Sequence, residues 1–159
     1  MTSRLERTTQ HRLESLNRIR ARGIDPYPHS YHPSHTIAEA IVQFEQGKNP
    51  EDVSLAGRIM ASRSMGKIAF FDIRDASSKM QLCFHYDSLD KYELLREVDI
   101  GDIIGVEGKL FRTKTSEITL DVSDFTILCK SLRPLPEKWH GLVDVEKTYR
   151  QRYLELITN

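Results

Sequence analysis

Cysteine is scarce in this sequence of 159 residues, in which Cys83 and Cys129 are the two that occur. Their separation matches none of the spacings with which cysteines bind a metal or exchange a disulfide. A scaffold held together by disulfide bonds is therefore excluded. We expect both side chains to be reduced thiols in a cytoplasmic protein.

Long apolar runs are also missing. No stretch of the sequence approaches the roughly 20 consecutive apolar residues that a membrane-spanning helix requires. Residues 1–7 do not form the hydrophobic centre of a signal peptide. We therefore expect a protein that does not associate with membranes.

The motifs of common enzyme classes are absent as well. The sequence has no glycine-rich phosphate loop, and no Ser-His-Asp or Cys-His arrangement stands in a supporting context. His29, His32 and His35 are evenly spaced, but Pro33 interrupts the helix that would align them on one metal ion. The sequence thus predicts no catalytic residue, no metal site and no cofactor in this chain.

What the sequence does have is an uneven distribution of charge. The 23 basic and 23 acidic residues balance overall, and the apolar fraction of 39% is ordinary for a globular protein. Residues 1–24, however, contain six arginines and two glutamates, a local charge of +4 that the rest of the chain offsets with −4. This basic arm is compatible with a polyanionic partner and equally with a solvated basic helix.

Two helices are predicted before residue 50. The first covers 4–22, with Leu13, Leu16 and Ile19 on one face, and it ends at Gly23. The second covers 36–46, where Thr36 and Glu39 have the spacing of a capping box.

From Val53 the apolar residues alternate, which is typical of strands. We predict strands over 53–61, 67–73, 79–85, 103–112 and 118–129, with a bend at Gly57, turns over 64–66, 75–78 and 113–117, and a helix over 88–97. A mainly β protein with this order of elements fits an OB-fold, a five-stranded Greek-key barrel with a helix between the third and fourth strands. Another small barrel or sandwich would have the same periodicity.

One strand pair has an unusual polar face. Ala69, Phe71 and Ile73 share the apolar face of the second strand, so Phe70 points the other way. By the same alternation Gln81 points to the face of the third strand that does not carry its apolar residues. An outward aromatic beside an outward amide and several cations is typical of sheets that bind single-stranded nucleic acid, because the ring stacks a base and the amide hydrogen-bonds to its edge.

The last thirty residues differ from the rest. Residues 132–136 form a proline-containing extended connector, and Asp144 could cap a helix with Tyr149, Tyr153 and Leu156 on its apolar face. We expect this helix to pack on a part of the protein that the sequence does not contain. The predicted organisation is a helical extension over 1–50, the barrel domain over 51–130, and over 131–159 a linker with the first helix of a further domain.

Several blocks resemble the class II lysyl-tRNA synthetases over their N-terminal anticodon-binding region. The blocks lie at 22–28, 56–60, 63–70, 110–117, 131–142 and 149–157. Two residues depart from the family pattern, Ser116 where glycine is usual and Glu155 where aspartate is usual.

The resemblance implies roles for residues of the barrel. Phe70 would stack the central uracil of the anticodon, Gln81 and Arg63 would hydrogen-bond to the same base, and Glu117 would bind a flanking base. Lys67, Lys79, Arg112 and Lys114 are candidate phosphate contacts. Strand alternation, however, places Arg63 with the apolar set, so its role requires the first strand to bend or end before it.

The resemblance also implies an activity for the whole protein. It would be a homodimeric lysine–tRNA ligase that uses ATP and magnesium, dimerises through its catalytic domain, and selects lysine tRNA by a U-rich anticodon. The present chain would recognise tRNA without catalysing the reaction.

Other interpretations stay open at this stage. Phe70 could pack under a loop at the barrel edge, Gln81 could be a solvated strand residue, Arg63 a phosphate or surface cation, and Glu117 a turn residue. The whole barrel could instead be a general single-strand binder or a dimerisation module.

Overall fold

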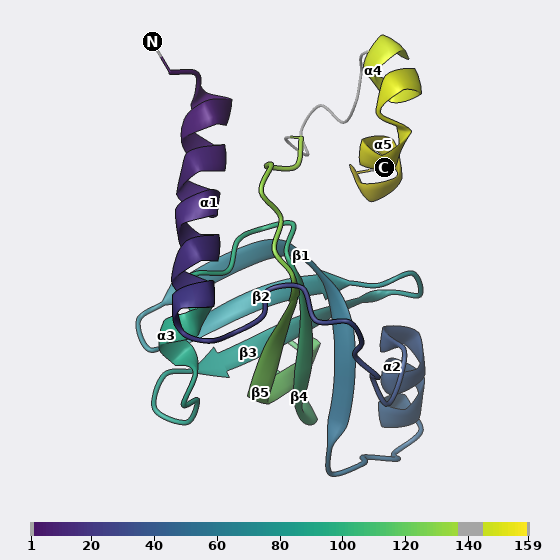
Figure 1. Cartoon of the computed structure of the whole chain (residues 1–159). Coiled ribbons are helices and arrows are strands. Elements are labelled where there is room, and N and C mark those ends of the chain that lie inside the picture. The colour runs from purple at the N-terminus through teal and green to yellow at the C-terminus, as the bar shows by residue number, and fades with distance from the viewer. Residues whose placement is uncertain (1, 137–144, 159) are drawn as a thin grey trace.

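The computed structural model describes residues 2–136 and 145–158. Figure 1 shows a β-barrel from which helix α1 extends on one side, while α2 packs beside the barrel. The elements in chain order are α1 (Arg4–Ala21), α2 (Ile37–Glu45), β1 (Val53–Met65), β2 (Ile68–Arg74), β3 (Lys79–His85), α3 (Tyr92–Leu95), β4 (Ile103–Arg112), β5 (Ile118–Cys129), α4 (Val145–Arg150) and α5 (Arg152–Thr158).

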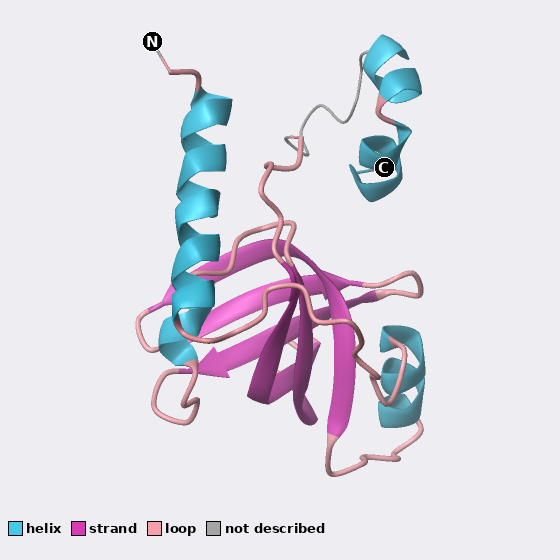
Figure 2. Cartoon of the chain, in the orientation of Figure 1, coloured by secondary structure: helices cyan, strands magenta, loops and turns pink. Residues whose placement is uncertain are grey.

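The five strands form a closed barrel in the order β1-β2-β3-β5-β4, coloured magenta in Figure 2. All neighbouring strands pair antiparallel except β3 and β5, which pair in parallel and close the ring. This is the predicted OB-fold, and it is confirmed. The interior is filled by alternating side chains of all five strands, including Ile59, Ile73, Leu82 and Phe125.

Helix α1 begins at the N-cap Ser3, which forms a capping box with Glu6. The predicted helix is confirmed, but its buried face differs from the predicted stripe. Leu16 and Ile19 are buried, whereas Leu13 is 39% exposed and Arg12 is buried in its place. The helix therefore uses a charged side chain as a packing residue.

Helix α2 has the predicted capping box of Thr36 and Glu39. A carboxylate from outside the helix adds to it, because Asp75 in the β2–β3 turn accepts a hydrogen bond of 2.9 Å from the backbone N–H of Ile37. Burial by itself would raise the pKa of Asp75, but hydrogen bonds from Ile37, Ser77 and Ser78 outweigh burial and lower it. Asp75 thereby attaches the N-terminus of α2 to the barrel.

Strand β1 contains a bulge that the sequence did not reveal. Ile59 pairs with Ile73, and the next pair is Ala61 with Asp72, so Met60 is an extra residue. Side chains after the bulge therefore point to the opposite side from those expected. Ala61 lies on the outer face with Asp72, whereas simple alternation from Val53 predicts that it points inward.

Three other expected boundaries were wrong. The helix predicted over 88–97 is the single turn α3, and Leu89 before it and Leu95 at its end are buried. Ser64 and Met65 extend β1 and leave Gly66 and Lys67 as the turn. The C-terminal helix is divided into α4 and α5 at Gln151, and its expected cap Asp144 lies outside the described residues.

The chain leaves the barrel through residues 130–133, the exit segment, which polar contacts hold in place. The ammonium group of Lys130, fully buried, donates to Asp99 at 2.5 Å and to Asp102 at 2.8 Å. The guanidinium of Arg12 donates to the carbonyl oxygens of Ile100, Ser131 and Arg133 at 2.9, 3.2 and 3.3 Å. These contacts join α1, the loop before β4 and the exit segment.

Among the described residues, none of the helices has both the length and the apolar character needed to cross a bilayer.

Candidate nucleic-acid interface

The outer face of β1, β2, β3 and β5 aligns four residues across the barrel. Arg63 pairs with Phe70, Phe70 with Cys83, and Cys83 with Asp121. Paired residues point to the same side of a sheet, so these four side chains share the outer face. Phe70 is half-buried there, while Phe71 points inward and packs on Phe84 with the ring centroids 5.2 Å apart. The predicted opposite directions of the two phenylalanines are confirmed.

Arg63 reaches this outer face because of the bulge at Met60. Alternation from Val53 would turn Arg63 inward, and the extra residue reverses its direction. The Cζ atom of Arg63 lies 5.8 Å from the centroid of the Phe70 ring, within the range of a cation–π contact. An aromatic ring and a guanidinium plane therefore lie together on an exposed strand pair, which is the combination that nucleobases stack on.

Gln81 lies one diagonal step from Phe70 on the same face, opposite Asp72. It points away from the barrel interior as predicted, but it is not a solvated strand residue, because only 7% of it is exposed. With its amide in the orientation that hydrogen bonding requires, the Gln81 nitrogen donates to Oε2 of Glu117 at 2.6 Å and to Oε1 at 3.2 Å. Glu117 thus holds the amide so that the Gln81 carbonyl oxygen remains available as an acceptor.

Gln81 and Glu117 line a groove of about 300 Å³ between the barrel and α2. Lys79 and Arg112 contribute cationic side chains to the groove, and Ile41 of α2 contributes an apolar wall. The floor offers an amide, a carboxylate and cations within one concave site. Such a mixture can bind an unpaired base by its edge and its phosphate by charge.

The turn between β4 and β5 positions Glu117. The backbone N–H of Thr113 donates to the Glu117 carbonyl oxygen at 3.0 Å, and that of Ser116 donates to the Thr113 carbonyl oxygen at 2.8 Å. Ser116 adopts φ of 65°, the left-handed conformation that glycine adopts most easily. The turn keeps a glycine-like backbone although this chain has serine there.

The four candidate phosphate contacts differ in their surroundings. Lys67 pairs with Asp87 at 3.5 Å, and Arg112 donates to the Ser116 carbonyl oxygen at 3.1 Å while lying over the ring of Phe44. Lys79 and Lys114 are exposed, and the side chain of neither makes a hydrogen bond or an ion pair within the part of the chain that the structure describes. These two lysines have the greatest freedom to meet a phosphate.

Comparison with known families identifies the barrel. Residues 53–128 match the family described as an OB-fold nucleic acid binding domain. This match supports the OB-fold assignment of the barrel. The matched residues span all five strands of the OB domain, including Arg63, Phe70, Gln81 and Glu117.

The chain around the OB domain is similar to lysine–tRNA ligases. That of Dehalococcoides mccartyi is 56% identical over 155 residues, which cover 93% of this chain and 31% of the relative. Those of Carboxydothermus hydrogenoformans and Moorella thermoacetica are 51% and 48% identical over 150 residues, with 93% of this chain and 30% of each relative covered. The resemblance stated from the sequence blocks is confirmed. The chain spans somewhat less than a third of the length of these relatives.

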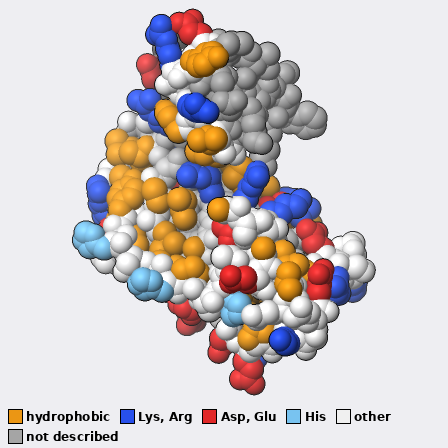
Figure 3. Space-filling model, turned by 90° about the vertical axis from the view of Figure 1, so that its right-hand side faces the viewer, with side chains coloured by type: hydrophobic (Ala, Val, Ile, Leu, Met, Phe, Trp, Pro, Cys, Tyr) orange, Lys and Arg blue, Asp and Glu red, His pale blue; other side chains and the backbone are white. Residues whose placement is uncertain are grey.

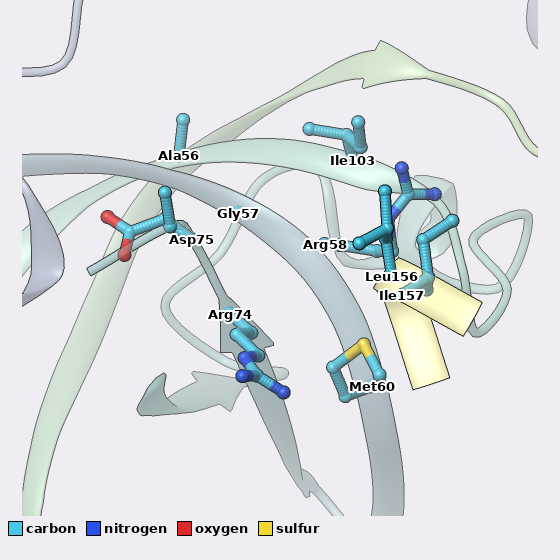
Figure 4. Close-up of a pocket in the computed structure, with 10 residues that line it drawn as sticks. Ala56, Gly57, Arg58, Met60, Arg74, Asp75, Ile103, Leu156 and Ile157 are labelled. Atoms are coloured by element: carbon cyan, nitrogen blue, oxygen red, sulfur yellow. The ribbon is translucent and has the colours of Figure 1, made fainter. Parts of the chain in front are cut away.

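A second cavity of the OB domain, of about 500 Å³, lies apart from these candidate residues. Figure 4 shows its lining, in which Arg58, Met60 and Arg74 of the barrel meet Leu156 and Ile157 of α5. None of the four residues predicted to bind the anticodon lines it.

One face of the molecule carries side chains of mixed character. On the face shown in Figure 3, basic, acidic and hydrophobic side chains are interspersed, and neither sign of charge covers the whole face. This face therefore does not carry a uniform basic patch.

Proposed function

We propose that this chain is the anticodon-binding region of a lysine–tRNA ligase, and that its barrel face selects lysine tRNA through a U-rich anticodon. The observation that best supports the proposal is the arrangement of Arg63, Phe70 and Gln81 on one outer face of an OB domain whose relatives are lysine–tRNA ligases.

The chemistry of these groups favours uracil. Uracil presents an N–H donor between two carbonyl acceptors. The Gln81 carbonyl oxygen, kept available by the hydrogen bond from its amide to Glu117, would accept from this N–H. The guanidinium of Arg63 would donate to a uracil carbonyl while the ring of Phe70 stacks the base. Cytosine has a ring acceptor in place of the N–H and would oppose the Gln81 oxygen with another acceptor, which leaves buried groups unpaired.

We assign the catalytic activity to the parts of a lysine–tRNA ligase that lie outside the region matched by this chain. The whole protein would join lysine to its tRNA with ATP and magnesium, act as a homodimer, and work in the cytoplasm. Lys79 and Lys114 would contact phosphates without contributing to base selection.

The test is a fluorescence titration of the purified chain with a labelled U-rich anticodon stem–loop. Phe70→Ala should weaken binding about 5- to 150-fold, the loss expected for one stacked base. Asp90→Ala and Tyr149→Ala, at exposed positions in a loop and in α4, are the matched controls and should leave affinity unchanged. Equal affinities for the wild type and Phe70→Ala would refute the stacking role.

A competition titration tests the selectivity. Unlabelled U-rich loops should displace the labelled RNA at far lower concentration than C-rich loops, and the preference should shrink in Gln81→Ala. Equal displacement by both loops would indicate a general single-strand binder instead. Salt-insensitive self-association with no RNA affinity would indicate a dimerisation module, because phosphate contacts make RNA binding weaken with salt.

A further inference from the structure

A cluster of metal-ligating side chains lies on the outer face of the barrel beside Phe70. The sulfur of Cys83 is 3.4 Å from Nε2 of His85, and the same nitrogen is 3.4 Å from Oδ1 of Asp121. One ligand atom from each residue lies within 4.8 Å of the other two. We propose that Cys83, His85 and Asp121 form a binding site for a divalent cation of the zinc class.

The barrel topology brings these three residues together. Cys83 and His85 are two residues apart on β3, so their side chains share one face. Asp121 is the Cα partner of Cys83 in the parallel pairing of β3 with β5 that closes the barrel. Because this pairing joins distant segments, the sequence alone offers no compact ligand motif.

The separations suit a tetrahedral ion. Zinc bonds of about 2.3 Å to sulfur and 2.0–2.2 Å to nitrogen or oxygen place tetrahedral ligand atoms roughly 3.3–3.8 Å apart. The two distances from Nε2 of His85, 3.4 Å to the Cys83 sulfur and 3.4 Å to Oδ1 of Asp121, fall in this range. An ion could therefore enter with small side-chain adjustments.

The ligand types select the class of ion. A thiolate and an imidazole favour zinc and similar transition metals, whereas magnesium and calcium prefer sites made of oxygen atoms. Three protein ligands leave one coordination position for water or another small ligand. The side chains of His85 and Asp121 are 40% and 51% exposed, so an ion can reach the site from solvent.

A lysine next to the site would compete with a metal ion for Asp121. Lys109 of β4 is the cross-strand partner of Asp121 and is exposed. Its ammonium group would weaken the attraction of Asp121 for a metal ion. Lys109→Ala should therefore tighten binding, whereas a change in an unrelated exposed lysine such as Lys48 should not.

The experiment is a titration of the purified chain, free of any polyhistidine tag, with Co²⁺ under reducing conditions. A bound thiolate gives a charge-transfer band in the near ultraviolet, and the visible bands report tetrahedral coordination. We expect saturation at one Co²⁺ per chain, and zinc should displace the cobalt. Absence of a thiolate band at millimolar Co²⁺ would overturn the proposal.

Variants identify the ligands. Cys83→Ser, His85→Ala and Asp121→Asn should each weaken cobalt binding at least 10-fold, with Cys83→Ser also abolishing the charge-transfer band. Cys129→Ser and His11→Ala are the matched controls and should change nothing, and circular dichroism checks that each variant is folded. A band that persists in Cys83→Ser, or that disappears in Cys129→Ser, would contradict the assignment.

Discussion

Phe70 and Phe71 are neighbours in the sequence, and the pleat of β2 gives them opposite surroundings. Phe71 is 6% exposed and packs in the core against Phe84. Phe70 lies on the outer face under the guanidinium of Arg63. Because the two residues have the same side chain, their difference depends entirely on which side of the strand each one faces.

Alternation within a regular strand therefore predicts to which side of the sheet a single side chain points. The directions of Phe70 and Gln81 followed from the sequence of β2 and β3 alone. The direction of Arg63 did not, because a bulge has no signature in the alternation that precedes it. The burial of Gln81 was also missed, since it depends on α2 and on the β4–β5 turn, which lie far from it in the sequence.

Ser116 permits a prediction at the residue scale. Its φ of 65° is costly for a residue with a Cβ atom, and its backbone bonds in the turn do not require the serine side chain. Ser116→Gly should raise the free energy of unfolding by up to about 1 kcal/mol, measured by urea denaturation. Ser116→Ala keeps the Cβ atom and serves as the control. A loss of stability in Ser116→Gly would show that the conformation is not strained.

At the scale of elements, the attachment of α2 to the barrel matters for the candidate interface. The helix supplies Ile41 and Glu45 to the groove that contains Gln81. Its N-terminus is held by the carboxylate of Asp75, which also accepts hydrogen bonds from the N–H groups of Ser77 and Ser78 at 2.7 and 2.9 Å. One turn residue therefore orders the β2–β3 turn and positions one wall of the groove.

Asp75 predicts a dependence of stability on pH. Its folded pKa is lowered from 3.8, so the carboxylate stabilises the folded state above the unfolded pKa and loses this contribution as pH falls through the folded pKa. At neutral pH, Asp75→Asn should lower the free energy of unfolding by about 1 kcal/mol. The difference from the wild type should shrink as pH falls from about 5 to about 2.

The measurement is denaturant unfolding of the wild type and Asp75→Asn across that pH range. Asp90→Asn, at an exposed position, is the control for a change in net charge. A wild-type advantage that stays constant with pH would rule out the ionised carboxylate as its source.

At the scale of the whole molecule, buried charges determine how the chain leaves the barrel. Lys130 is fully buried between two carboxylates, and the hydroxyl of Tyr27 donates to the Lys130 carbonyl oxygen at 2.8 Å. The guanidinium of Arg12 adds hydrogen bonds from α1 to the same segment. A domain that follows the exit segment would begin from a fixed point and direction.

Arg12 permits a prediction at this scale. Arg12→Ala leaves the carbonyl groups of Ile100, Ser131 and Arg133 without their charged donor and should lower the free energy of unfolding by about 1–3 kcal/mol. Hydrogen–deuterium exchange should become faster in α1 and in residues 130–133, while the barrel strands keep their protection. Arg7→Ala, an exposed arginine of the same helix, is the control. Unchanged exchange in the exit segment would contradict the proposed connection.

The barrel could be predicted from the sequence more accurately than the side-chain contacts around it. The alternating residues of β2 to β5, the stop of α1 at Gly23 and the capping box of α2 are local signals, and they predicted these elements correctly. The ion pairs of Lys130 and the contacts of Arg12 join residues about one hundred positions apart or lie in irregular segments, where no periodic pattern exists. Such contacts follow from the closed barrel and cannot be inferred before it is known.

The bulge in β1 has a consequence for how this region could vary among natural proteins. If β1 lost the bulge but kept every residue, simple alternation from Ile59 would turn Arg63 to the barrel interior and Ser62 outward. Replacing Met60 by another amino acid leaves the direction of Arg63 unchanged. Natural variants are therefore expected either to keep the extra residue as a bulge or to lose the residue and the bulge together, because both arrangements leave Arg63 outside.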